Sequence, residues 1–333
     1  MKQYKKIINP KISIISAVYN SEKYIFRFLK CIQNQNFKDV EILFINDYSK
    51  DNSINIIEEY RKKDKRIILI NNKKNKGTFI SRNIGVLYSK GKYLILPDPD
   101  DIISKNILSA CFKLSEKNNY DIIKYNEYIG NGKILFKDIF NKLGNKAIYK
   151  PKLSTYIYYG NNELKIIDFS ISNKFIKKVV FIKALNLLKK YYLNEYIIFS
   201  EDSLMNYIIF RIAESFLYLN KIGYYYIRHQ LSITKNLFTK SSRRINMIFK
   251  YLNFISKYTK NNKYEKDMAN HLLITLSKDY NIANRLTNLN SDYKFYLNII
   301  NEFLNSKFIK NENILLLEMY KDILMKKCQN RYY

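Results

Sequence analysis

The chain has 333 residues, 47% of them hydrophobic, which is enough to bury the core of one large α/β domain and an appended second region. It has no run of about 18 apolar residues, and its basic first ten residues lack the apolar stretch of a signal peptide, so we expect neither a transmembrane helix nor a secretory leader. The formal net charge of +29 is spread along the chain without a nucleic-acid-binding motif, so we expect no nucleic acid partner.

Strand and helix patterns alternate through the first third of the chain. The expected strands are apolar runs at residues 12–18, 40–45, 67–70 and 93–96, and the expected helices between them cover residues 23–33, 53–60 and 78–89. Strands that are separated by helices of this length are typical of βαβ units. The sequence therefore predicts a mostly parallel sheet flanked by helices.

The pattern becomes mixed after residue 121. A strand is expected at 121–125 and helices at 179–189 and 202–213, and amphipathic helices follow from about residue 235 to the end. We therefore expect an α/β domain over residues 1–235 and a helical C-terminal region over residues 236–333.

The fourth expected strand runs into the acidic segment Leu96–Asp101, in which Asp98, Asp100 and Asp101 lie close together. Ligands of open α/β sheets bind at the carboxyl ends of the strands. Carboxylates held this close repel one another unless a cation or a sugar hydroxyl offsets them, and Mg²⁺ favours one or two carboxylates together with substrate phosphates. The segment therefore indicates a divalent metal on a phosphate-bearing ligand. The alternative is a polar turn in which Asp101 caps a helix that starts at Ile102.

Several segments, in order, resemble the nucleotide-sugar glycosyltransferases of family 2, which have a GT-A fold. They are 17–20 (Ala-Val-Tyr-Asn), 45–53 (Ile-Asn-Asp-Tyr-Ser-Lys-Asp-Asn-Ser), the stretch 75–93, and the acidic segment that follows it. Each motif is weak alone, but together, in register at the family's spacing, they are a strong signal. The resemblance implies a Rossmann-like, mostly parallel sheet as a catalytic domain, with a helical C-terminal region.

The resemblance also implies a donor site. It places the nucleotide base at Asp47, where a carboxylate accepts a hydrogen bond from a pyrimidine N–H, and the diphosphate at Arg82. Asp100 would bind Mg²⁺ or Mn²⁺ directly, and Asp98 would bind the ribose hydroxyls or a water on the metal. The further donor-binding residues that it implies are Tyr19, Asn20 and Asn83. From the residues alone, Asp47 can also be a turn residue and Arg82 a solvated helix charge.

Two later segments extend the resemblance. Residues 172–178 are similar to a family segment that begins Trp-Asn-Lys, here with Ser in place of Trp, and imply acceptor contacts for Asn173 and Lys174. The pair Glu201 and Asp202 resembles the acidic pair that carries the family's general base, and we assign the base to Asp202, with Glu201 as the next candidate. A carboxylate at a helix N-terminus stays ionised, which suits a base. The alternative is a helix cap.

The segment 223–234 is similar to a tyrosine-rich stretch that in the family forms a flexible loop near the donor diphosphate. It implies donor contacts for Arg228 and Ser232, and His229 as a metal ligand, as in some members. A histidine without partners at ligand spacing is otherwise a polar surface residue.

Three positions depart from the family's pattern. Asn46 replaces an Asp, Tyr48 replaces the Gly that permits a tight turn, and Pro97 precedes the Asp-x-Asp formed by Asp98 and Asp100. Asp47, Asp100 and Asp202 are all present, so the departures do not predict an inactive protein.

We therefore predict a metal-dependent, inverting glycosyltransferase that moves a sugar from a nucleotide-diphospho-sugar, such as a UDP-sugar, to a hydroxyl of a glycan, lipid-linked or protein-linked acceptor. The alternatives are a non-catalytic module that binds nucleotide sugars and, less favoured, a basic nucleic-acid-binding protein. Three widely spaced cysteines predict reduced thiols and a cytoplasmic location. The basic helices of 236–333 either cover the catalytic domain or touch an anionic membrane peripherally.

Overall fold

The computed structural model describes residues 8–129, 133–135, 145, 147–149, 159–160, 163–164, 170–189 and 201–227, and in addition 300–301, 318, 321–322 and 325. The chain divides into two compact units, Met1–His229 and Gln230–Tyr333. The helices expected after residue 235 lie outside the described residues, apart from those few positions. None of the helices in the described part combines the length and apolar character that a membrane span requires.

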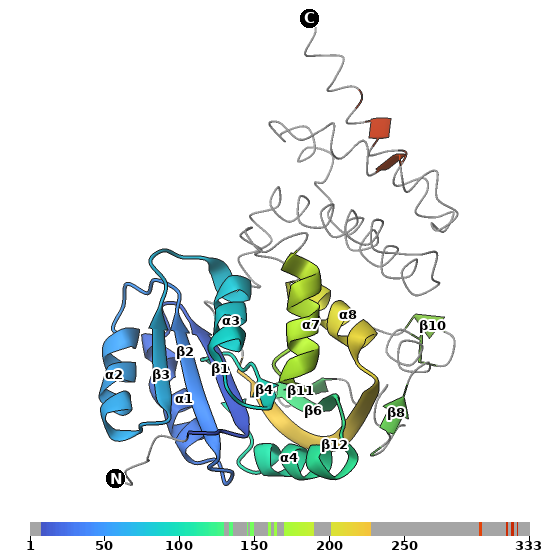
Figure 1. Ribbon diagram of the computed structural model, residues 1–333. Helices are drawn as coiled ribbons and strands as arrows, with labels where there is room; N and C mark the ends of the chain where they lie inside the picture. Colours follow the sequence, from blue (N-terminus) through green and yellow to red (C-terminus); the bar gives the residue numbers. More distant parts are fainter. Residues whose placement is uncertain are drawn as a thin grey trace, which may run out of the picture. The chain divides into compact units, whose positions relative to one another are not determined.

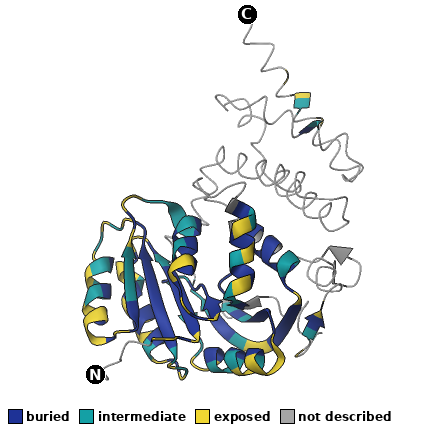
Figure 2. Ribbon diagram, viewed as in Figure 1, coloured by how far each residue is buried: buried dark blue, intermediate teal, exposed yellow. Residues whose placement is uncertain are grey.

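Four parallel strands form the first half of a large mixed sheet (Figure 1). In spatial order they are β3 (Ile67–Asn71), β2 (Val40–Asn46), β1 (Ile12–Val18) and β4 (Tyr93–Ile95). β1, β2 and β4 are rich in Ile, Leu and Val and are almost fully buried, as parallel strands covered on both faces are (Figure 2). The predicted parallel sheet is confirmed, and each expected strand of the first third is present.

Helices cover both faces of this sheet. On one face lie α1 (Glu22–Gln33), α2 (Ser53–Lys63) and α4 (Ile107–Asn118), whose apolar side chains form one core with alternate residues of β1 and β2. On the other face lie α3 (Gly77–Tyr88), α7 (Lys178–Lys189) and α8 (Glu201–Ile212) (Figure 1). The helices expected before residue 214 are therefore confirmed, with α2 continuing to Lys63.

Gly85 brings α3 close to the sheet. A Cβ atom at this position would lie 2.3 Å from Cγ2 of Ile15 and 2.8 Å from Cδ1 of Ile45, closer than real side chains approach. The glycine therefore lets the helix lie directly on β1 and β2. This contact fixes the height of α3 above the sheet and with it the position of Arg82, one turn earlier.

The second half of the sheet mixes strand directions. β11 (Lys174–Lys177) runs antiparallel between β4 and β6 (Ile122–Ile129), and the long strand β12 (Ser215–Tyr226) runs parallel to β6. Five short strands complete the described sheets: β5 (Ile102–Ile103) and β8 (Ala147–Tyr149) on β12, β7 (Lys133–Leu135) on β6, and a separate pair of β9 (Tyr159–Gly160) with β10 (Glu163–Leu164).

Two expectations from the sequence are wrong here. Asp101 does not cap a helix, because the next two residues form β5 on the edge of β12, and the following helix starts only at Ile107. The segment expected as a loop from residue 223 begins inside a strand, because residues 223–226 continue the pairing of β12 with β6. Both differences come from pairing between segments far apart in the sequence, which local patterns do not reveal.

Candidate active site

The site lies at the carboxyl edge of the parallel strands. β2 and β3 lie on one side of β1 and β4 lies on the other, so the strand order reverses between β1 and β4. Such a reversal leaves a crevice outside the strand ends where ligands of open α/β sheets bind. Tyr19 and Asn20 follow β1, Asp47 follows β2, and the acidic segment follows β4, so the structure brings these predicted residues to one edge.

The loops after β1 and β2 are joined by hydrogen bonds. Asn20 has φ of 48°, its N–H donates to Oγ of Ser49 over 3.1 Å, and its Oδ1 accepts from the N–H of Lys50 over 2.8 Å. The neighbouring Tyr19 ring is half exposed at the edge of the sheet. Asn20 therefore builds the loop, while Tyr19 presents an aromatic surface to a ligand.

Asp47 is buried and accepts three hydrogen bonds. Its Oδ1 takes the side-chain amide of Asn72 over 2.9 Å and the N–H of Lys76 over 2.7 Å, and its Oδ2 takes the N–H of Gly77 over 2.7 Å. The last two N–H groups belong to the start of α3, where a carboxylate is favoured by the helix dipole and by otherwise unpaired N–H groups. Asp47 thus joins the end of β2 to the first turn of α3.

The two departures at this loop are accommodated by the structure. Asn46 donates its amide to Oδ1 of Asn71 over 2.9 Å, a bond that an ionised Asp cannot donate, and its Oδ1 accepts the N–H of Ser49. Tyr48 has φ of 69°, so it adopts the left-handed conformation for which Gly is usually selected. The ammonium of Lys50 lies 3.6 Å from the centre of the Tyr48 ring. The turn keeps its form without glycine.

The acidic segment presents two carboxylates and buries the third. Asp98 and Asp100 are partly exposed, and the carbonyl of Asp100 accepts a hydrogen bond from Arg27 of α1. Asp101 is buried, and both of its oxygens accept hydrogen bonds from the end of β12, from the Tyr224 hydroxyl and from the N–H of Ile227. Asp98 and Asp100 are therefore the members that a ligand can reach.

The donor set of this segment fits a hard divalent cation. Among the residues that the structure describes, no cluster of three or more His, Cys, Asp or Glu is suited to hold a metal by itself. Mg²⁺ is commonly held by one or two carboxylates together with ligand phosphates. Asp100 and Asp98 can supply the carboxylates. Burial, followed by the charges of Asp98 and Asp100, raises the pKa of Asp101 to about 8. A cation on this segment would relieve that repulsion.

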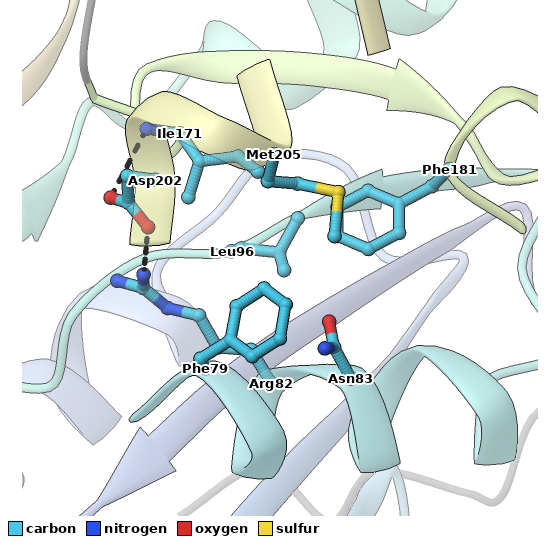
Figure 3. Close-up of a pocket in the computed structure, with 8 residues that line it drawn as sticks. All are labelled: Phe79, Arg82, Asn83, Leu96, Ile171, Phe181, Asp202 and Met205. Atoms are coloured by element: carbon cyan, nitrogen blue, oxygen red, sulfur yellow. Dashed lines mark hydrogen bonds and ion pairs between the residues drawn. The ribbon is translucent and has the colours of Figure 1, made fainter. Parts of the chain in front are cut away.

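Arg82 joins the acidic segment to α8. Its Nη2 donates to Oδ1 of Asp98 over 2.6 Å. Its Nη1 donates to Oδ1 of Asp202, also over 2.6 Å (Figure 3). The side chain of Arg82 is 5% exposed, while Asp98 and Asp202 are 35% and 27% exposed. The alternative of a solvated helix charge is therefore wrong for Arg82. Arg82 lies in the middle of α3, which begins at Gly77.

Asp202 lies at the start of α8 and faces this edge. Besides Arg82, its carboxylate accepts the N–H of Ile171 over 3.4 Å. Burial raises the pKa of Asp202, against the lowering effect of the Arg82 charge, and the negative charge of Asp98 raises it further. A carboxylate with a raised pKa that is still partly exposed has the properties of a general base. Its neighbour Glu201 begins the same helix, and its side chain lies outside the described part.

A small cavity lies beneath the contact of Arg82 with Asp202 (Figure 3). It has an empty volume of about 210 Å³, part of it open to solvent. Its walls are mostly apolar side chains from α3, α7, α8 and the segments that follow β4 and precede β11: Phe79, Phe181, Met205, Leu96 and Ile171. Asn83 lines it as well, and within the described residues its buried Nδ2 has no hydrogen-bond partner. The cavity puts apolar surface directly beside the candidate base.

The two predicted acceptor residues are fully buried. Asn173 donates its amide to Oε2 of Glu127 over 3.1 Å, and the ammonium of Lys174 donates to the carbonyl of Ser170 and to Oδ1 of Asn173. The positive charge of Lys174 is close enough to lower the pKa of Asp202. Both residues support the turn before β11, only Lys174 affects the charge balance of the candidate base, and neither side chain reaches the surface.

Three predicted residues lie outside the described part of the chain, namely Arg228, His229 and Ser232. The structure also reveals contacts that the sequence reasoning missed. Tyr224 binds the acidic segment, and the hydroxyl of Ser172 donates to Oδ2 of Asp98 over 3.4 Å. Three consecutive tyrosines at 224–226 carry no local signal for this contact. Ser172 stands where the resemblance expects Trp, and that departure was the available signal.

The chain was compared with known families and proteins. The family model described as glycosyl transferase family 2 matches residues 13–185. Several curated relatives are matched over only 31–39% of their own length. A longer match is the poly(ribitol-phosphate) beta-N-acetylglucosaminyltransferase TarP of Staphylococcus aureus, 28% identical over 268 residues, which are 78% of this chain and 77% of TarP.

Two solved structures have a similar fold. TarS 1-349 of S. aureus in complex with UDP-GlcNAc has a TM-score of 0.68 at 18% identity, over 95% of this chain and 89% of that one. The mannosyltransferase PcManGT from Pyrobaculum calidifontis, in complex with GDP-Man and Mn²⁺, has a TM-score of 0.54 at 12% identity, over 99% of this chain and 90% of that one. The expected GT-A type of fold is confirmed by these two structures.

Proposed function

The chain belongs to glycosyl transferase family 2, and from this premise we propose that it moves a sugar from a UDP-sugar to a hydroxyl of an acceptor, with inversion and with a divalent metal. The observation that carries this proposal is the ion-paired group of Arg82, Asp98 and Asp202, which joins the acidic segment to a candidate base at one strand edge. We refer to it below as the Arg82 triad.

The donor would lie over the carboxyl ends of β1, β2 and β4. Tyr19 offers an aromatic face for the base, and Asp47 lies where the family binds it. Since Asp47 already accepts three hydrogen bonds, a pyrimidine N–H would share or replace one of them. TarS in complex with UDP-GlcNAc, a protein of similar fold, supports a uridine nucleotide as donor.

A divalent cation, Mg²⁺ or Mn²⁺, would be held by Asp100 and Asp98 together with the donor diphosphate. When bound, the cation supplies positive charge that stabilises the departing diphosphate. The fit of the carboxylates supports this, as does PcManGT, whose structure contains Mn²⁺. Arg82 is an additional fixed positive charge at the same edge, and its guanidinium suits a phosphate oxygen as well as a carboxylate.

Asp202 would act as the base. The acceptor hydroxyl oxygen forms a bond to the anomeric carbon while the bond from that carbon to the diphosphate oxygen breaks. The hydroxyl proton passes to the Asp202 carboxylate, and the departing UDP leaves on the opposite face of the sugar, which inverts the anomeric centre. Arg82 holds Asp202 in place for this transfer, and the charges of Arg82 and Lys174 lower the pKa of Asp202 against the raising effect of burial.

The acceptor would be a glycan, lipid-linked or protein-linked hydroxyl compound. TarP is named for a poly(ribitol-phosphate) acceptor, which is a polyanion, and a net charge of +29 suits an anionic acceptor of that kind. We propose residues 1–235 as the catalytic domain and 236–333 as a helical region for acceptor or membrane contact. A cytoplasmic protein with peripheral contact to an anionic membrane agrees with this proposal.

A donor screen tests the function. The purified chain would be incubated with UDP-, GDP- and TDP-sugars in Mn²⁺, and release of the nucleoside diphosphate would be measured with and without chelator. We expect release from a UDP-sugar that stops when the chelator is added. Tight binding of UDP-sugars without any turnover would favour the non-catalytic alternative. No nucleotide-sugar binding, together with salt-dependent binding of random oligonucleotides, would contradict the proposal.

A further inference from the structure

The acidic segment is attached to β12 by a buried hydrogen-bond chain. The N–H of Asp98 donates to the hydroxyl oxygen of Tyr224 over 3.1 Å, and the same hydroxyl donates to Oδ2 of Asp101 over 2.6 Å. Oδ1 of Asp101 accepts the N–H of Ile227 over 2.8 Å. Tyr224 and Asp101 are each 1% exposed. One tyrosine hydroxyl thus bonds both ends of the short segment that carries Asp100.

β12 is shaped to bring Tyr224 to this point. Its pairing with β6 shifts register between Leu219 and Ile222 and again between Ile222 and Tyr224, and such irregularities re-aim side chains next to active sites. Gly223 allows the strand to approach its neighbours, since a Cβ there would lie 2.3 Å from the Tyr125 ring. Ser104 donates its N–H to the Gly223 carbonyl over 2.9 Å, and this bond fixes β12 beside β5.

Asp101 is buried, and each of its carboxylate oxygens accepts a hydrogen bond from within the fold. Both of its carboxylate oxygens are engaged inside the fold, whereas Asp98 and Asp100 on the same segment are partly exposed. The role of the third acidic residue is therefore different from that of the first two. Arg27 holds the Asp100 carbonyl from the other side, so the segment is fixed from both α1 and β12.

We propose that Tyr224 and Asp101 are positioning residues that set the orientation of Asp98 and Asp100 toward the divalent cation and the donor diphosphate. This inference rests on the proposed function. Carboxylates that bind a cation are oriented by hydrogen-bonding neighbours, and loss of such a neighbour usually weakens metal binding by about 10- to 100-fold. The acidic segment lies between β4 and β5, outside any helix or strand, so its geometry depends on side-chain contacts. Tyr224 bonds both Asp98 and Asp101 through one hydroxyl.

The test compares two tyrosines of the same strand. Tyr224→Phe removes the hydroxyl that bonds Asp98 and Asp101, and Tyr218→Phe removes a hydroxyl that donates to Asn126. Both rings are buried in β12, so both variants lose a buried hydrogen bond. Binding of Mn²⁺ would be followed by the loss of its free electron paramagnetic resonance signal at saturating UDP, and folding by thermal unfolding.

We expect Tyr224→Phe to raise the Mn²⁺ concentration for half-saturation about tenfold or more, while Tyr218→Phe stays within about twofold of the wild-type value. Asp101→Asn, which keeps the shape and one acceptor oxygen, should give an intermediate shift, and it decides the question if Tyr224→Phe does not fold. Equal Mn²⁺ binding by folded Tyr224→Phe or Asp101→Asn and the wild type overturns the positioning role. If the wild type itself does not bind Mn²⁺ with UDP, the metal-dependent function is wrong instead.

Discussion

Two groups of Arg and Asp side chains lie at opposite ends of the parallel strands and differ in solvent exposure. At the amino end of β3, Arg66 and Asp64 form a pair with two hydrogen bonds, of 2.9 and 2.7 Å, and their side chains are 1% and 0% exposed. At the carboxyl edge, the guanidinium of Arg82 is shared between Asp98 and Asp202, which are both about one third exposed. The chemistry is the same, but only the second group is open to a ligand.

This difference in exposure distinguishes a structural charge pair from a group that we propose to be functional. A bidentate pair that is fully buried cannot be reached by a substrate, so its contribution is to the folded state alone. The Arg82 triad divides one cation between two anions, and each anion keeps a face toward solvent. A cation on Asp98 or a diphosphate on Arg82 can therefore change the partners in the triad without unfolding the protein. The pair at the amino edge has no such freedom.

The largest expected effect is on the Arg82 triad. Asp202→Asn keeps the shape of the side chain but removes the base, so sugar transfer should fall by about 10²–10⁴-fold while UDP affinity stays near the wild-type value. Initial rates at saturating donor, with UDP binding by calorimetry, measure both quantities. A transfer rate equal to that of the wild type would mean that another residue is the base, and Glu201 would be the first to test.

For the buried pair of Arg66 and Asp64 we expect a loss of stability without a loss of UDP binding. Arg66→Met removes one partner of the buried pair and leaves the Asp64 charge without compensation, which typically destabilises a protein by about 3–5 kcal/mol. Denaturant unfolding would measure this loss, and the folded fraction should bind UDP as the wild type does. If Arg66→Met lowers UDP affinity in the folded protein but not stability, the division into structural and functional charge does not hold.

A smaller effect should appear in the pH dependence of transfer. The proposed base Asp202 can accept a proton only when it is ionised, so we expect activity to be lost as the pH falls through its pKa. Burial raises that pKa above the ordinary value for Asp, as does the charge of Asp98, while Arg82 and Lys174 lower it. Arg82→Gln removes a lowering charge, so the acid limb of kcat should move to higher pH.

The control for this experiment is Arg61→Gln. Arg61 pairs with Glu58 on the surface of α2. Its loss removes the same charge from the face of the sheet opposite to α3, which carries Arg82. An acid limb that stays at the wild-type pH in Arg82→Gln would show that Asp202 is not the group that titrates.

The first half of the fold was predictable because its signals are local. β1, β2 and β3 are apolar, β-branched runs, and the helices between them have clear apolar spacing, so their positions could be inferred closely from the sequence. β11 and β5 were not recognised. β11 is four residues long and half of them are lysines, and β5 has only two residues, so both are strands because of the partners beside them.

The site was predictable as a set of residues but not as a set of contacts. The motifs identified Asp47, Asp98, Arg82 and Asp202, yet the ion pair between the last two joins positions 120 residues apart. No local pattern predicts that Asp47 accepts hydrogen bonds from the start of α3. Burial of Lys174 was also hidden, because a lysine in a short polar segment is usually exposed.

The most direct test of the account is whether Asp100 holds the metal on which the donor depends. UDP would be titrated into wild-type protein, Asp100→Ala and Glu116→Ala by calorimetry, with Mn²⁺ and again with chelator. Glu116→Ala removes the same charge from a surface ion pair with Lys92. The account predicts that Asp100→Ala abolishes the Mn²⁺-dependent part of UDP binding, while Glu116→Ala binds as the wild type does. Equal Mn²⁺-dependent affinity in Asp100→Ala and the wild type would contradict it.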